Sequence, residues 1–108
     1  MAIHHAAPAE VVDVSPLAGR LRDSKTAVLI KTHTLEVIRI VLPAGKQLPP
    51  HRVDGEITVQ CLEGRIKFGA DGTEHELAKG QMLYLQGGAT HELRGVEDSS
   101  VLVTILLK

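Results

Sequence analysis

Two histidines, His51 and His91, are the side chains in this sequence whose type and setting suit metal or ligand binding. A neutral imidazole can bind Zn, Ni, Cu or Fe through a ring nitrogen, and it can also act as a hydrogen-bonding group. Two imidazoles brought together could therefore begin a metal site or anchor a small molecule in a pocket. Whether they meet depends on the elements that carry them.

Each histidine lies in a segment with regularly placed glycines. The first segment contains Gly45, His51, Val53, Ile57 and Gly64. Between successive members of this set lie five, one, three and six other residues. The second segment contains Gly80, Gln86, Gly88, His91 and Gly95. Between successive members of this set lie five, one, two and three other residues. This pair of segments resembles the two motifs that define the cupin family, in particular its small single-domain members of the RmlC-like, cupin 2 type.

The resemblance implies an all-β fold, the double-stranded β-helix that is also called the cupin or jelly-roll barrel. In that family three His and one Glu hold a divalent metal inside the barrel. His51 and His91 match two of these ligands, whereas Val53 stands in place of the third His and Ile57 in place of the Glu. Gln86 replaces a Pro of the second motif, and Gly95 replaces its Asn. The resemblance therefore implies the fold, together with a metal site that keeps half of its ligands.

Two other side chains are candidates for a third ligand. Glu56 precedes Ile57 by one residue, and a shift of one residue along a strand places a side chain on the opposite face. Only a bulge near Gly55 would turn Glu56 inward, so we expect it to be solvated. Cys61 shares the alternating face of His51. We expect Cys61 to be a buried small hydrophobe, and a soft ligand for Zn or Cu is the second interpretation. A nucleophile ranks third, because it would need a lowered pKa and the apolar surroundings should raise the pKa of the thiol.

The turn residues along the chain predict where the strands that position these residues begin and end. Apolar and β-branched runs end at Gly, Pro or Asp turns, which is typical of an all-β barrel. The expected strands are 28–31, 35–42, 58–62, 65–68, 73–78, 81–86, 91–94 and 101–107. Ser15 followed by Pro16 predicts the start of a short helix over 16–23. Arg39 interrupts an apolar run and is expected at the surface. We divide the chain into a tail with a short helix or turn (1–26) and the barrel (27–108).

Composition narrows the class of protein. The 108 residues suit one domain, and a net charge of −1 with mixed acids and bases predicts no nucleic-acid or membrane partner. A single cysteine and the lack of a signal-peptide pattern favour the cytoplasm. The segment 101–107 is apolar on both faces and 35–42 is largely apolar. Such strands need cover on both sides, which predicts a homodimer.

Two functional hypotheses remain. In the first, the barrel binds a small molecule, with His51 and His91 as polar anchors and with at most one weakly held divalent metal (Zn, Ni, Fe or Mn). In the second, the same residues form a minimal metal-dependent enzyme of the dioxygenase, isomerase or decarboxylase type. The two missing ligands favour the binding module. A third ligand from Glu56 or Cys61 would favour the enzyme.

Overall fold

A computed structural model describes residues 4–107, so the first three residues of the expected tail and the last residue of the expected barrel lie outside it. Within this range the chain forms nine strands and one short 3-10 helix. In chain order the elements are η1 (Ala18–Asp23), β1 (Ala27–Lys31), β2 (Leu35–Leu42), β3 (Gln47–His51), β4 (Ile57–Glu63), β5 (Arg65–Ala70), β6 (Thr73–Ala78), β7 (Met82–Leu85), β8 (His91–Gly95) and β9 (Ser99–Leu106). None of the helices in the described range is long and apolar enough to cross a membrane.

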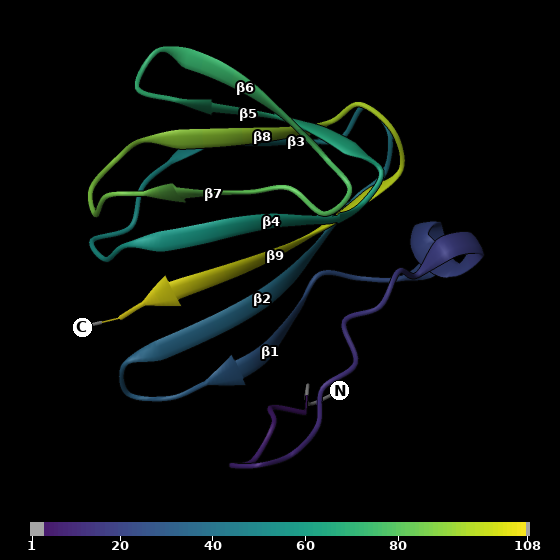
Figure 1. The fold of residues 1–108 in the computed structure, drawn as a ribbon, viewed down its shortest axis with the longest axis vertical. Helices are drawn as coiled ribbons and strands as arrows, with labels where there is room; N and C mark the ends of the chain where they lie inside the picture. Colours follow the sequence, from purple (N-terminus) through teal and green to yellow (C-terminus); the bar gives the residue numbers. More distant parts are fainter. Residues whose placement is uncertain (1–3, 108) are drawn as a thin grey trace.

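The strands form two antiparallel sheets that enclose the core (Figure 1). One sheet has five strands in the order β1-β2-β9-β4-β7, and the other has four in the order β3-β8-β5-β6. Strands far apart in sequence are therefore neighbours: β9 lies between β2 and β4, and β8 lies between β3 and β5. The prediction of an all-β jelly-roll barrel is confirmed.

One strand is missing from the sequence prediction. β3 (Gln47–His51) contains Pro49 and Pro50, which cannot donate backbone hydrogen bonds, so its sequence does not read as a strand. It is the edge strand of the four-stranded sheet, where a proline can face away from its one neighbour. Its pairing with β8 also shifts register between Leu48 and His51, across the two prolines.

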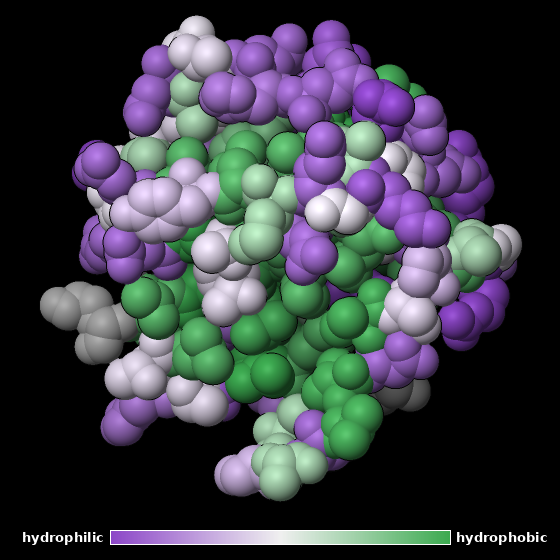
Figure 2. Space-filling model, in the orientation of Figure 1, coloured by the Kyte–Doolittle hydropathy of each residue, from purple (hydrophilic) through white to green (hydrophobic). Residues whose placement is uncertain are grey.

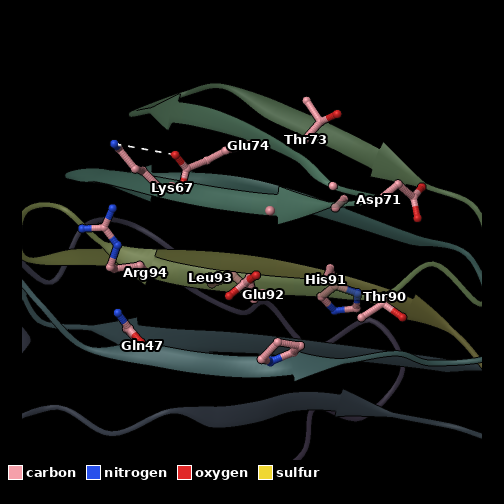
Figure 3. Close-up of a pocket in the computed structure, with 14 residues that line it drawn as sticks. Gln47, Lys67, Asp71, Thr73, Glu74, Thr90, His91, Glu92, Leu93 and Arg94 are labelled. Carbon is pink, nitrogen blue, oxygen red and sulfur yellow. Dashed lines mark ion pairs between the residues drawn. The ribbon is translucent and has the colours of Figure 1, made fainter.

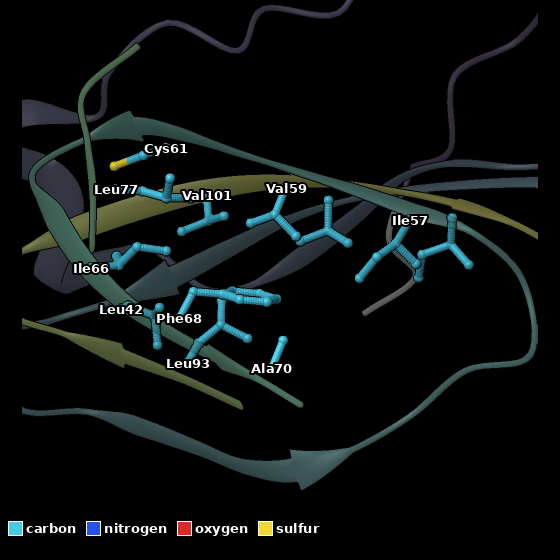
Figure 4. Packing of buried hydrophobic residues seen from close by; sticks show 12 residues of the cluster. Leu42, Ile57, Val59, Cys61, Ile66, Phe68, Ala70, Leu77, Leu93 and Val101 are labelled. Carbon is cyan, nitrogen blue, oxygen red and sulfur yellow. The ribbon is translucent and has the colours of Figure 1, made fainter. Parts of the chain in front are cut away.

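The core consists of the inward faces of both sheets (Figure 4). Along β4, buried and half-buried residues alternate, which is the burial expected when one face of a strand packs inside. Phe68 is fully buried at the centre of the cluster and supplies its only aromatic ring. The other fully or largely buried members are Leu42, Ile57, Val59, Cys61, Ile66, Ala70, Leu77, Leu93, Val101, Val103 and Ile105.

The N-terminal segment is held on the outside of the five-stranded sheet by a buried carboxylate. Glu63 is 9% exposed and accepts hydrogen bonds from the backbone N–H groups of Leu17 and Ala18 and from the Ser100 hydroxyl. Burial raises the pKa of Glu63, but these hydrogen bonds together outweigh it, so the net pKa lies below its ordinary value. Glu63 therefore stays ionised at neutral pH and fixes the start of η1.

This attachment overturns two expectations. Arg39 is not at the surface: it is 9% exposed, because it lies under the N-terminal segment and donates a hydrogen bond to the Ser15 carbonyl. Nor does Ser15 begin the helix. Its hydroxyl donates to Asp13, and η1 starts after Leu17, whose own side chain cannot cap it. The carboxylate of Glu63 takes over the capping role from 46 positions away along the chain.

Candidate functional site

The two predicted site histidines lie side by side at one end of the barrel. His51 is the last residue of β3 and His91 the first of β8, and the two are directly paired across these strands. Their ring centroids are 4.4 Å apart, with the ring planes tilted by 60°. Two residues 40 positions apart thus meet because an edge strand and its neighbour are in register at this point.

The two rings differ in their surroundings. His91 is 5% exposed, and its ring stacks on Phe68 at a centroid distance of 5.6 Å and an interplanar angle of 9°. Burial, reinforced by the neighbouring His51, lowers the pKa of His91 below its ordinary value despite a hydrogen bond to the Ala89 carbonyl. His91 is therefore neutral at pH 7. His51 is exposed, so one ring of the pair is buried in the interior and the other contacts solvent at the barrel mouth.

Backbone carbonyls orient both rings in the same way. Nδ1 of His91 lies 3.1 Å from the carbonyl oxygen of Ala89, and Nδ1 of His51 lies 3.4 Å from that of Pro49. A carbonyl can only accept a hydrogen bond, so in each neutral ring the proton belongs on Nδ1. Nε2 of each ring then keeps its lone pair. Metal-binding histidines are commonly held by this arrangement, with one nitrogen donating to a carbonyl and the other free for the ligand.

The inward face predicted from His51 to Cys61 is not one continuous strand face. His51 ends β3 in the four-stranded sheet, Ile57 begins β4 in the five-stranded sheet, and residues 52–56 connect the two sheets. Alternation therefore holds along β4, where Ile57 and Cys61 are buried, but it does not extend back to His51. The expectation that Cys61 shares the alternating face of His51 is therefore wrong, because the two residues lie on strands of different sheets. Val53 is half-buried in the connection and packs against the core.

Glu56 lies outside the barrel interior. Its side chain is exposed, and its carboxylate accepts a hydrogen bond of 2.7 Å from the Tyr84 hydroxyl on β7. The bulge that would have turned Glu56 inward is absent from the described pairing of β4 with β7, which is regular from Ile57 onward. The backbone of Glu56 is also fixed, because its carbonyl accepts a hydrogen bond from the Leu106 N–H. Glu56 thus does not join the histidine pair.

Cys61 is fully buried at the other end of β4 from Ile57 (Figure 4). The two residues are four positions apart along the strand, or about 13 Å. The Cys61 thiol contacts the carbonyl of Glu63 at 3.3 Å, and burial raises its pKa above the ordinary value. A protonated thiol turned toward the far end of the barrel is the small hydrophobe that the sequence predicted.

The site thus consists of two oriented imidazoles at the mouth of an aliphatic barrel. Across residues 4–107, no group of three or more His, Cys, Asp or Glu side chains is arranged to hold a metal ion. The residues fit a metal only in part, since they supply two nitrogen ligands and leave the remaining positions to a bound molecule or water. Phe68, which supports His91, was not predicted as part of the site. Its place in the strand 65–68 gave no indication of which histidine it would meet.

Comparison with known proteins identifies the family. The profile of the Cupin domain family matches residues 38–107, well over half of the chain, and this chain belongs to that family. A cupin superfamily protein from Desulfitobacterium hafniense is similar in structure, with a TM-score of 0.79 and 13% identity over 100% of both chains. An RmlC-like cupin protein from Desulfovibrio desulfuricans has a TM-score of 0.77 and 26% identity over 91% of this chain and 97% of that one.

Enzymes also occur among the similar structures. Salicylate 1,2-dioxygenase from Pseudoaminobacter salicylatoxidans has a TM-score of 0.69 and 17% identity over 74% of this chain and 25% of that one. At this identity the likeness concerns the fold alone, because one barrel supports many unrelated activities. No curated protein matches the sequence.

Proposed function

We propose that this cupin is a small-molecule binding module whose site is the barrel mouth at His51 and His91. The observation that carries the proposal is the pair of rings 4.4 Å apart, each held through Nδ1 by a backbone carbonyl. Nε2 of each ring is then available as an acceptor or ligand, and the ring of His91 is supported by the stacked Phe68 ring. A few convergent polar atoms against an apolar wall are the usual composition of a small-molecule site.

A single divalent metal (Zn, Ni, Fe or Mn) is the second part of the proposal. The two imidazoles would hold it, and the metal would supply open coordination positions for an anionic group of the ligand. With two protein ligands instead of three or four, the metal would be held weakly. The enzyme hypothesis is less well supported, because Glu56 is bound to Tyr84 and Cys61 lies at the far end of β4.

Titration of the purified, untagged protein with Zn²⁺, Ni²⁺ and Mn²⁺ tests the site. We expect weak binding that is lost on mild chelation, and we expect His51→Ala or His91→Ala to lower the affinity by at least about tenfold, since each change removes a direct bond. Binding should also weaken as the pH falls, because a proton and a metal compete for the same nitrogen of each ring. His75→Ala is the matched control, as His75 is an exposed histidine on β6. Equal losses in all three variants would contradict the proposal.

We also propose that the chain forms a homodimer through the outer face of its five-stranded sheet. We call the following residues the outer sheet patch: Thr58, Gln60, Leu62, Met82, Tyr84, Leu102, Thr104 and Leu106. They lie on β4, β7 and β9 and point away from the core, and Met82, Tyr84 and Leu106 are 58%, 57% and 47% exposed. Figure 2 shows hydrophobic residues gathered over this sheet.

A second copy of the chain is the occupant that this surface favours. No member of the outer sheet patch carries a charge, so two copies related by a two-fold axis can meet without like-charge repulsion. The cores of protein interfaces are likewise depleted of charged residues and enriched in aromatic residues and Met. The N-terminal segment is hydrogen-bonded to the sheet at Leu29, Arg39 and Glu63, none of which belongs to the patch, and Met82, Tyr84 and Leu106 of the patch stay at least 47% exposed.

Sedimentation equilibrium at micromolar concentration tests the dimer. We expect the dimer mass for the unmodified protein and the monomer mass for Leu102→Lys, which places a charge among the apolar residues of the patch. Leu102 is only half-buried, so the variant should still fold. Val11→Lys is the control: Val11 is 91% exposed on the N-terminal segment, and its replacement should leave the dimer unchanged. A monomer mass for the unmodified protein would overturn the proposal.

A further inference from the structure

A polar groove of about 450 Å³ lies on the outer face of the four-stranded sheet, and His91 is among the residues that line it (Figure 3). Four consecutive residues of β8 line this groove, but neighbouring residues of a strand point to opposite faces, so Glu92 and Arg94 present their side chains to it while His91 and Leu93 are largely buried. The groove therefore borders the barrel mouth at His91, but His51 does not line it, and its charged side chains Lys67, Glu92 and Arg94 lie on the outer face of the sheet.

Two cations face each other across one end of the groove. Lys67 on β5 is directly paired with Arg94 on β8, and Arg94 is paired on its other side with Gln47 of β3. Like charges placed directly opposite each other on neighbouring strands destabilise a sheet. The cost falls when an anion lies between them. Figure 3 shows the nitrogen atoms of all three side chains at the same end of the groove.

The carboxylates of the chain leave this cationic end incompletely neutralised. Lys67 has one partner, Glu74, at 3.8 Å. Arg94 is half-buried, yet it forms no ion pair with any carboxylate between residues 4 and 107. A guanidinium offers a planar pair of donors that matches a carboxylate group. Arg94 is thus available to bind a carboxylate that is not part of the protein.

The middle of the groove has the opposite charge. Glu92 is paired with Gly69, and a Cβ at Gly69 would lie 3.2 Å from Cγ and 3.4 Å from Oε1 of Glu92. The absence of a side chain at Gly69 thus lets the carboxylate of Glu92 lie along the floor of the groove. Asp71 adds a second acid at the far end, away from the cations (Figure 3).

We propose that this groove binds a small zwitterion of the amino acid class, with its carboxylate at Arg94 and its ammonium at Glu92. The two residues are separated by one position on β8, so their Cα atoms lie about 7 Å apart, a span that one small molecule can bridge. Once Lys67 is paired with Glu74, Arg94 remains as the cation, and Glu92 and Asp71 remain as the acids. An amino acid with a basic side chain complements this balance best, since its second cation can approach Asp71.

Amide NMR titration of the 15N-labelled protein with L-lysine, glycine and L-glutamate tests the groove. Gly69 is the natural reporter, because its backbone forms the floor. We expect the tightest binding for L-lysine and the weakest for L-glutamate. Arg94→Gln should weaken L-lysine binding by at least about tenfold, as the loss of a charged hydrogen-bonding partner usually does. Glu92→Gln should weaken L-lysine binding but leave propionate, which has no ammonium group, unaffected.

Two controls separate this proposal from the others. Arg65→Gln removes another outward-facing arginine of the same sheet, one already paired with Glu76 at 2.8 Å. This change should leave the affinity for L-lysine unaltered. His51→Ala should also leave the groove unchanged, so failure of the barrel-mouth proposal and failure of this one are distinguishable. If propionate binds as well as L-lysine, or if Glu92→Gln has no effect, the groove is not a zwitterion site. Unshifted signals of Gly69 with every amino acid would likewise overturn the proposal.

Discussion

Gly55→Ala is expected to destabilise the protein by more than about 3 kcal/mol, because it forces an atom into the backbone of a neighbouring strand. A Cβ on Gly55 would lie 1.7 Å from the carbonyl oxygen of Leu106 and 2.9 Å from its carbonyl carbon. Neither atom can rotate away as the end of a flexible side chain could. Either the connection 52–56 or the end of β9 would have to move. That movement would break the hydrogen bond from the Leu106 N–H to the Glu56 carbonyl.

Urea denaturation followed by circular dichroism measures this loss. Gly19→Ala is the matched control, since a Cβ at Gly19 would meet nothing within 4 Å. That change should leave the free energy of unfolding within about 1 kcal/mol of the original value, or raise it slightly, because alanine has less conformational freedom in the unfolded chain. An unchanged denaturation midpoint for Gly55→Ala would show that the connection 52–56 does not lie against β9.

Restoring the family ligands with Val53→His and Ile57→Glu is expected to raise metal affinity by more than about 100-fold, through two added metal–ligand bonds. Without metal the same double change should lower the free energy of unfolding by about 3–5 kcal/mol, the cost of an unpaired buried charge. Ile57 is only 3% exposed, so its replacement by Glu places a carboxylate inside the barrel. Added Zn²⁺ should recover much of the lost stability, since metal binding stabilises the folded state.

Isothermal titration with Zn²⁺, Ni²⁺ and Mn²⁺ gives the affinities, and thermal denaturation with and without metal gives the stabilities. Val59→Glu is the matched control, because Val59 lies on the same inward face of β4 and is 1% exposed. It should destabilise the protein by a similar amount without gaining affinity. Should the double variant bind metal no better than the original chain, Val53 and Ile57 do not share a site with His51 and His91.

The features that the sequence determined are those that depend on short stretches of chain. Alternating apolar residues bounded by Gly, Pro and Asp turns were sufficient to predict all strands except β3, whose two prolines conceal an edge strand. The resemblance of the segments around His51 and His91 to the two cupin motifs implied that the two residues come together, and their ring centroids lie 4.4 Å apart. Burial of Cys61 followed from its place among aliphatic residues.

The tertiary structure decided whatever depends on register between distant strands. Sequence alternation across 51–61 could not reveal that the chain changes sheets at 52–56, which leaves His51 exposed while Ile57 is buried. Arg39 is buried because a remote segment lies over it, held by a carboxylate whose hydrogen bonds span 45 and 46 positions. The facing of Lys67 and Arg94 arises likewise from the pairing of β5 with β8. Side-chain direction follows from local geometry, but the choice of neighbour follows from the packing of the whole barrel.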